Sequence, residues 1–366
     1  MKVIERSEES SEKGRKGEIA LAAGIRWPHG PHEPHKPHEP HDFKSHDESH
    51  ERITEGVNPR SSNLDLRTTI EILSIMNQED NEVPRAVALE LPEIAAAVDA
   101  IVSRLRAGGR LVYAGAGTSG RMAALDALEI PPTFGVDPGI IRALVAGGPA
   151  AFTRPDEAAE DDFEAGKRDV EELVPTRSDV VMGIAAGGRT PYVLGAMKAG
   201  RSAGSFVIGL ACNRGTPMEG IADLMIRPIV GPEIITGSTR LKAGTAQKLV
   251  LNMISTAVMT RLGLVYDGFM IGMRPVNSKL WERARSIVAS ISGVGEVEAG
   301  AALNSAGGDI RVAVLQCMGN MDVEDARQLL ASSGGNLREA LTRINGEGNQ
   351  REGHQGKGYQ GVCGLE

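Results

Sequence analysis

The segment from Leu111 to Gly135, LVYAGAGTSGRMAALDALEIPPTFG, constrains the fold more than any other part of the chain. Its initial apolar run predicts a strand buried on both faces of a parallel sheet. Gly115 and Gly117 allow a tight turn, and Thr118 and Ser119 lie where a helix would begin. Because the first backbone N–H groups of a helix are unpaired, these groups and the two hydroxyls can converge on an anion. The segment therefore predicts a phosphate-binding turn between a strand and a helix.

The same glycines also match a dinucleotide-binding fingerprint, Gly115-x-Gly117-x-x-Gly120. That fingerprint requires an acidic residue about 20 positions further on, after a second strand, to hold a ribose hydroxyl. The acid at that distance, Asp137, lies in a loop rich in proline and glycine. A hydroxyl pair also suits a terminal phosphomonoester better than a pyrophosphate. We therefore favour a sugar phosphate over a nucleotide, and a purely structural glycine turn remains the third interpretation.

Composition narrows the class of protein. The chain has 366 residues, room for roughly two domains, and 41% hydrophobic residues, as in an ordinary globular protein. A net charge of −8 argues against a nucleic-acid partner. The chain has no stretch of about 18 apolar residues, so we predict no membrane span. The charged N-terminus does not resemble a signal peptide. We therefore expect a cytoplasmic protein. Three scattered cysteines predict neither a disulfide framework nor a zinc site.

Residues 1–52 are polar and rich in histidine and proline. Histidines recur every third position in PHGPHEPHKPHEPH, at His29, His32, His35, His38 and His41. This period matches polyproline II, in which the imidazoles would share one face that could bind a transition metal. The composition is more typical of a disordered leader, to which we assign no catalytic role.

Apolar residues at helical spacing predict helices between residues 53 and 107, after which strands and helices alternate. Further strands are predicted at Ile140–Val145, Val180–Ala185, Phe206–Ala211 and Leu224–Val230. This alternation predicts an α/β fold with a doubly wound parallel five-stranded sheet, whose ligands bind at the carboxyl ends of the strands.

Two further groups of polar residues follow these strands. The third strand leads into Gly187, Gly188 and Thr190, before a proline at a helix start. Near the start of a later, long helix the chain offers three hydroxyls and an ammonium group, those of Thr236, Ser238, Thr239 and Lys242. Helix capping would explain one of these hydroxyls but not all four groups. We therefore include Gly187, Gly188, Thr190, Ser238, Thr239 and Lys242 with Gly117, Thr118 and Ser119 as candidate phosphate-binding residues.

Three motifs carry a family resemblance: GAGTSGRMAALDALEIPPTFG, GRTPYV and GPEIITGSTRLKAGTAQKLVLNMIST. They resemble the N-acetylmuramic acid 6-phosphate etherases of the sugar isomerase (SIS) superfamily, from about Ile53 to about Ile344. The resemblance implies a SIS-type αβα sandwich with N-terminal helices over residues 53–275. It also implies a small helical module, similar to a ubiquitin-associated domain, over residues 276–345. We expect residues 346–366 to be a disordered tail.

An internal repeat with an offset of 27 residues supports that helical module. Glu298-Ala299 and Gly307-Gly308-Asp309 recur as Asp325-Ala326 and Gly334-Gly335-Asn336. Paired glycines that end one short helix before another predict small helical units. We expect a cap or dimer-packing module rather than a ubiquitin binder.

The resemblance also implies a reaction, the hydrolysis of the lactyl ether to N-acetylglucosamine 6-phosphate and D-lactate. In the open-chain sugar a base removes the proton on carbon 2, lactate leaves carbon 3, and water adds to the unsaturated aldehyde. Two glutamates match the family's catalytic positions. We assign Glu129 to protonate lactate and activate water, and Glu160 to remove the carbon 2 proton. No metal or cofactor is needed, and the family implies a homodimer with sites near the interface.

Departures from the family pattern leave two other functions open. Gly187 replaces the serine usual in the second phosphate loop, Leu128 and Ile130 replace the usual Ser and Cys beside the glutamate, and residues 263–268 also differ. One alternative is a non-catalytic phosphosugar sensor similar to the glucokinase regulatory proteins, which retention of both glutamates disfavours. The other is a phosphosugar isomerase or dinucleotide-binding enzyme.

Overall fold

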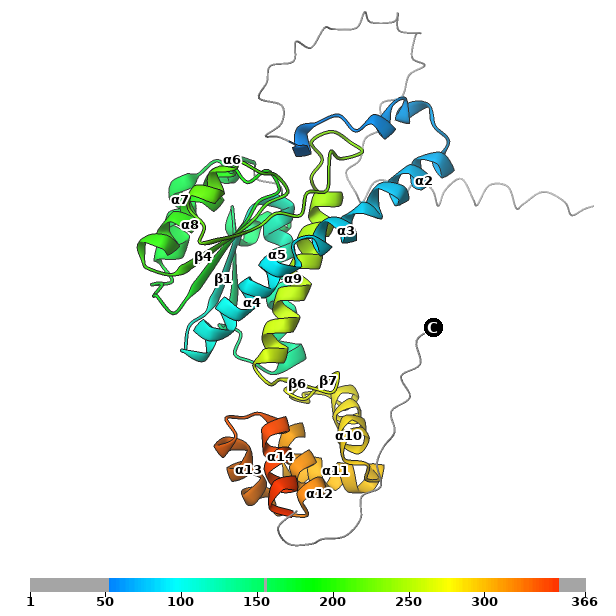
Figure 1. The fold of residues 1–366 in the computed structure, drawn as a ribbon, viewed down its shortest axis with the longest axis vertical. Coiled ribbons are helices and arrows are strands. Elements are labelled where there is room, and N and C mark those ends of the chain that lie inside the picture. Colours follow the sequence, from blue (N-terminus) through cyan, green and yellow to red (C-terminus); the bar gives the residue numbers. More distant parts are fainter. Residues whose placement is uncertain (1–52, 155–156, 349–366) are drawn as a thin grey trace, which may run out of the picture. The chain divides into compact units, whose positions relative to one another are not determined.

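The computed structural model describes residues 53–154 and 157–348 (Figure 1). It confirms the predicted sheet, whose five strands are all parallel and lie in the order β2, β1, β3, β4, β5. The strands are β1 (Leu111–Gly115), β2 (Ile141–Val145), β3 (Val180–Ile184), β4 (Phe206–Leu210) and β5 (Leu224–Ile226). The last strand was predicted to reach Val230 but ends earlier, since Pro228 has no N–H to donate to a ladder.

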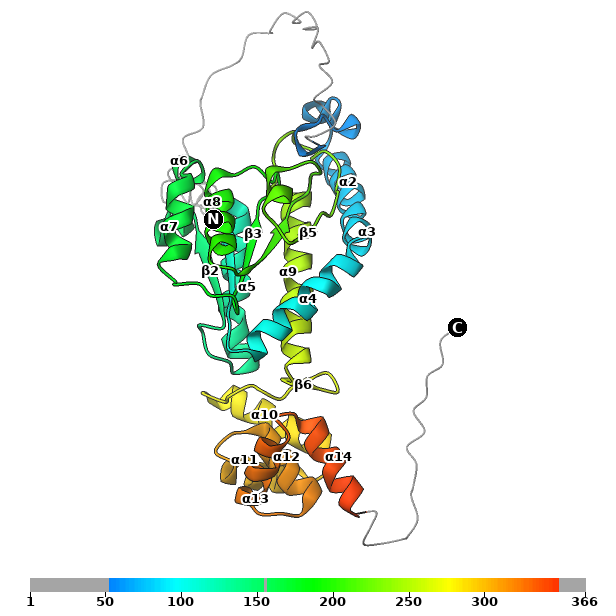
Figure 2. The ribbon, with the colours of Figure 1, turned by 60° about the vertical axis from the view of Figure 1, so that its left-hand side comes forward.

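Helices cover both faces of the sheet (Figures 1 and 2). One face packs against α3 (Glu82–Ala88), α4 (Leu91–Arg106), α5 (Gly117–Phe134) and α9 (Lys242–Arg261), and the other against α7 (Phe163–Glu171) and α8 (Pro191–Ser202). Leu111 and Tyr113 of β1 face the first layer, whereas Val112 and Ala114 face the second. Because successive side chains in a strand point to opposite faces, a strand covered on both faces must be apolar throughout.

The N-terminal helix α2 (Thr69–Asp80) was predicted from apolar residues at helical spacing. The helix forms, but Ile70 and Leu73 are 69% and 55% exposed, so the expected core-facing stripe is not covered within the described residues. Its start is fixed locally instead. The backbone N–H and the hydroxyl of Thr68 both donate to a Glu71 carboxylate oxygen, at 2.8 and 2.7 Å. Such a capping box stabilises a helix end without tertiary burial.

The C-terminal helices pack around an apolar cluster of their own. They are α10 (Ser278–Ser292), α11 (Glu296–Ser305), α12 (Ile310–Gly319), α13 (Val323–Ser332) and α14 (Leu337–Gly348). The repeated glycine pairs separate α11 from α12 and α13 from α14, and all four glycines have positive φ. A short hairpin, β6 (Val265–Tyr266) with β7 (Phe269–Met270), precedes them and was not predicted.

Several predictions fall partly or wholly outside this range. The leader, with its histidine repeat, and residues 349–366 of the predicted tail lie outside the described residues. The helix α14 continues through Gly348, beyond the predicted start of the tail at residue 346. Within the described ranges no single helix has the length and apolarity of a membrane span, although α10 and α11, bent by 111° at their junction, reach these limits together.

Candidate functional site

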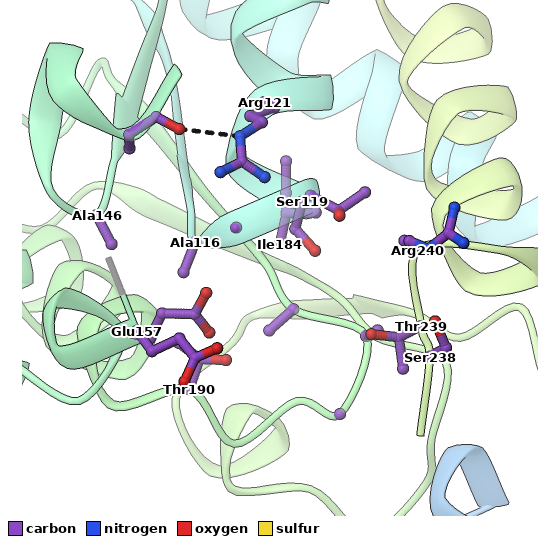
Figure 3. Close-up of a pocket in the computed structure, with 17 residues that line it drawn as sticks. Ala116, Ser119, Arg121, Ala146, Glu157, Ile184, Thr190, Ser238, Thr239 and Arg240 are labelled. Atoms are coloured by element: carbon purple, nitrogen blue, oxygen red, sulfur yellow. Dashed lines mark hydrogen bonds between the residues drawn. The ribbon is translucent and has the colours of Figure 1, made fainter. Parts of the chain in front are cut away.

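A cavity of about 350 Å³ opens where β1, β2 and β3 end (Figure 3). The residues that follow these strands, Ala116, Ala146 and Ala185, all line it. It lies where a doubly wound sheet is expected to bind its ligand, at the carboxyl ends of the strands. Figure 3 shows Ser238 and Thr239 across the cavity from Glu157 and Thr190.

Most of the candidate phosphate-binding residues line this cavity. They are Gly117, Thr118, Ser119, Gly187, Thr190, Ser238 and Thr239. Gly188 and Lys242 do not. Loops that are far apart in the sequence thus bring their hydroxyls to one space of a size suited to a small phosphorylated molecule.

The glycines of the β1–α5 turn are explained by packing and not by a nucleotide. A Cβ on Gly120 would lie 2.7 Å from the carbonyl oxygen of Gly115 and 2.8 Å from a methyl group of Val145. The helix therefore crosses the strand closely only because both residues are glycine. Asp137, the residue that would have to hold a ribose, accepts a hydrogen bond from the N–H of Gly139 in its own loop and does not line the cavity.

Glu160, on the short helix α6 (Glu157–Glu160), places its carboxylate at the start of α5. A Cβ on Gly117 would lie 2.7 Å from Oε1 of Glu160, so the carboxylate occupies space that any other residue at 117 would fill. Gly117 also has a φ of +51°, in the left-handed region. Conformation and space therefore both require glycine beside this carboxylate.

The pKa of Glu160 is raised above its ordinary value. Burial is the largest cause, and the negative charges of Asp161 and Glu157 add to it, while the positive charge of Arg121 opposes it. A raised pKa makes the carboxylate a stronger base and allows it to hold a proton nearer neutral pH. Glu160 is thus a carboxylate of raised pKa that lies at the start of α5.

Glu129, the other predicted catalytic residue, does not line this cavity. It lies twelve residues after Gly117 on the same helix, about 18 Å along its axis at 1.5 Å per residue, and its side chain is exposed. The prolines at 131 and 132 do not stop the helix, which continues to Phe134. One chain therefore does not bring Glu129 and Glu160 together.

Lys242 was expected to contact phosphate, but its side chain is buried elsewhere. Its Nζ donates to Oε2 of Glu79 at 2.6 Å, and Nδ2 of Asn58 donates to the same oxygen at 2.7 Å. Burial opposes ionisation of Glu79, yet these hydrogen bonds hold the pKa of Glu79 below its usual value. An ammonium group paired and buried in this way is not available to a ligand in the cavity.

A second buried carboxylate holds the start of α9. Glu233 accepts hydrogen bonds from the backbone N–H groups of Lys242 and Ala243, at 3.0 and 2.9 Å. It supplies the acceptors that the first turn of a helix lacks. Together with the Lys242–Glu79 pair it fixes both ends of the loop that carries Ser238 and Thr239. Part of the third sequence motif therefore holds this loop in place and does not contact the cavity.

Three charged residues that were not selected from the sequence also line the cavity: Arg121, Glu157 and Arg240. The Nε of Arg121 donates to the carbonyl oxygen of Ala151 at 3.0 Å, which directs its side chain toward the cavity (Figure 3). The position of Arg121 in the first turn after the phosphate-binding turn was the signal available in the sequence. Within residues 53–154 and 157–348, no group of three or more His, Cys, Asp and Glu side chains has a geometry suited to a metal ion.

Comparison with known proteins identifies the family. Residues 93–201 match the model of the glucokinase regulatory protein N-terminal SIS domain. The chain is 49% identical over 291 residues to N-acetylmuramic acid 6-phosphate etherase from Caldanaerobacter subterraneus, a match that covers 80% of this chain and 95% of that protein. It is 48% identical over 288 residues to the protein of that name from Streptomyces coelicolor, covering 79% and 93%.

Among solved structures, a phosphoheptose isomerase from Neisseria gonorrhoeae aligns with a TM-score of 0.43 and 18% identity, covering 53% of this chain and all of that one.

The two etherases match over nearly their whole length and at high identity. The chain therefore belongs to the N-acetylmuramic acid 6-phosphate etherase family.

Proposed function

We propose that this protein cleaves the D-lactyl ether of N-acetylmuramic acid 6-phosphate, giving N-acetylglucosamine 6-phosphate and D-lactate. One observation carries the proposal: a carboxylate of raised pKa, Glu160, lies against the helix start of a cavity lined by hydroxyls from several loops. The near full-length similarity to etherases supports the choice of substrate. The enzyme would be a carbon–oxygen lyase that acts in amino-sugar recycling.

The phosphate would bind at the N-terminus of α5. Thr118 and Ser119 lie in the first turn of this helix, and Ser238 and Thr239 approach from the loop before α9. Free backbone N–H groups and the positive end of the helix dipole favour a dianion there. Arg121 and Arg240 add positive charge, as a phosphomonoester requires.

Glu160 would act at carbon 2 of the open-chain sugar. Its carboxylate takes the proton made acidic by the neighbouring aldehyde, and the electron pair left on carbon 2 expels the lactate oxygen from carbon 3. Water then adds to carbon 3 of the unsaturated aldehyde, and carbon 2 regains a proton. Each proton transfer needs a group whose pKa lies closer to neutrality than that of an exposed carboxylate, as is the pKa of Glu160.

Glu129 would protonate the departing lactate and later activate water, but in the cavity of another subunit. We propose a homodimer for this reason. Glu129 is exposed on α5 beside Leu125 and Leu128, which are 43% and 71% exposed and lie one helical turn apart. Exposed apolar side chains around a carboxylate are typical of a surface that another chain covers.

The direct test incubates the protein with N-acetylmuramic acid 6-phosphate in deuterated water and measures D-lactate and the label in the sugar product. We expect D-lactate and one deuterium at carbon 2. The Glu160→Gln variant is the control for contaminating activity. Lactate no greater than that of the control would contradict the proposal, and tight phosphosugar binding without turnover would instead indicate a regulator of the type matched by residues 93–201.

A further inference from the structure

The hydroxyl of Ser119, which lines the cavity, is already engaged within the protein. It donates to Oε1 of Gln247, on α9, at 2.9 Å. Gln247 is 1% exposed, and its Nε2 is buried without any hydrogen-bond partner among the described residues. The amide oxygen of Gln247 thus accepts the hydrogen bond of a hydroxyl that is expected to bind the ligand. The amide nitrogen makes no hydrogen bond.

This arrangement opposes phosphate binding. A serine hydroxyl has one hydrogen to donate, and a phosphate dianion accepts hydrogen bonds without offering one. While that hydrogen points to Gln247, only the lone pairs of Ser119 can face the cavity, where they would repel phosphate oxygens. The hydroxyl can serve phosphate only if its hydrogen is released and its oxygen is satisfied from the other side.

Rotation of the Gln247 amide by half a turn meets both conditions. The carboxamide oxygen and nitrogen are nearly equal in size, so that exchanging them changes the hydrogen bonding and not the packing. The unpartnered Nε2 would then donate to Oγ of Ser119, and the hydroxyl hydrogen would turn toward the cavity.

The surroundings of Gln247 hold its side chain beside Ser119. Its neighbours Ala243, Ala246 and Val250 on α9 are fully buried, so that the helix cannot withdraw from the cavity. The helix start is held by Glu233 and by the Lys242–Glu79 pair. The side chain therefore stays beside Ser119, and the change that phosphate requires is confined to the orientation of its amide.

We propose that Gln247 is a positioning residue that sets the direction of the Ser119 hydrogen bond and turns its amide nitrogen to Ser119 when phosphate binds. The inference rests on the proposed function for the identity of the phosphate group, but not for the sugar or the chemistry. Ser119 touches the ligand, and Gln247 acts only through Ser119.

The test measures the dissociation constant for inorganic phosphate by calorimetry on the full chain. The variants are Gln247→Glu and Gln247→Met, each made in the wild-type chain and in the Ser119→Ala chain. At a pH high enough to ionise the buried glutamate, it can only accept from Ser119, so Gln247→Glu should weaken phosphate binding about tenfold to a hundredfold when Ser119 is present. The loss should fade at lower pH, where the protonated carboxyl can donate to Ser119. Gln247→Met, which leaves the hydroxyl free but unoriented, should weaken it only a few-fold.

The Ser119→Ala background separates this role from added charge and from misfolding. The introduced charge acts on phosphate in both backgrounds, whereas the coupling through the hydroxyl exists only with Ser119. We expect the effect of Gln247→Glu to shrink at least about fivefold in the Ser119→Ala background. An equal effect in both backgrounds, or no effect with Ser119, would overturn the proposal. Since the ligand is inorganic phosphate, a chain that shows the coupling but releases no D-lactate would refute the etherase assignment alone.

Discussion

The two ends of α5 differ in how much of a ligand site a single chain supplies around them. At its start, Gly117, Thr118 and Ser119 line a cavity that other segments of the same chain complete. Near its end, Glu129 lies exposed beside Leu125 and Leu128, outside that cavity. A phosphate-binding turn needs only the local geometry of a strand and a helix. Glu129 lies about 18 Å away along the same helix, so the proposed role of Glu129 in catalysis requires a second chain.

The largest expected effect comes from removing the carboxylate of Glu160, at the start of α5, or that of Glu129, near its end. Glu160→Gln and Glu129→Gln should each lower kcat for lactate release by about 10² to 10⁴, since each removes a proposed general acid or base. Phosphate binding should change little in Glu129→Gln, because the proposed role of Glu129 is at the lactyl ether on carbon 3 and not at the phosphate. A loss of phosphate affinity in Glu129→Gln as large as that in a variant of the phosphate-binding turn would contradict the separation of phosphate binding from lactate protonation.

The contact between Gly117 and Glu160 gives the next largest effect. In Gly117→Ala the new methyl group would overlap Oε1 of Glu160 and displace it, and a misplacement of that order can cost about 10² in rate. Gly148→Ala is the matched control, because Gly148 also has a positive φ, of +60°, but no atom within 4 Å of the added carbon. Both should lose about 1–2 kcal/mol of stability from backbone strain, measured by urea unfolding, and only the first should lose activity.

Replacing Gly187 with the serine that is usual in the family should strengthen substrate binding in the cavity. A Cβ on Gly187 meets no atom within 4 Å, so that Gly187→Ser adds a hydroxyl without a clash. A charge-assisted hydrogen bond of about 1.5–3 kcal/mol would lower KM about tenfold to a hundredfold, or less where water already fills the place. An unchanged or higher KM would show that the ligand does not reach this loop.

The smallest effect is a shift in pH dependence. Because the pKa of Glu160 is raised, the ionised base is lost, and kcat/KM falls, as the pH drops through a value above that of an ordinary glutamate. Glu157→Gln removes one negative neighbour and should move this fall to lower pH, by less than the full shift since burial is the larger cause. A move to higher pH would contradict the assignment of Glu160 as the base.

The sequence predicted the cavity end better than the Glu129 end for a physical reason. Uninterrupted apolar strands, turn glycines and helix starts are local patterns, and they located the sheet and most of the cavity. The burial of Lys242 against Glu79 could not be predicted, because the two residues are 163 positions apart and a lysine beside hydroxyls suggests phosphate. The contribution of Arg240 also depends on which side of a loop faces the cavity.

Mixing two inactive variants tests the central claim, that the site joins Glu160 of one chain to Glu129 of another. Glu129→Gln and Glu160→Gln chains are unfolded together, refolded in equal amounts, and assayed for D-lactate. A mixed dimer has one complete site, and random pairing makes half of the dimers mixed, so the account predicts about one quarter of wild-type activity. Activity that stays at the level of the separate variants, with mixed dimers shown to form, would contradict it.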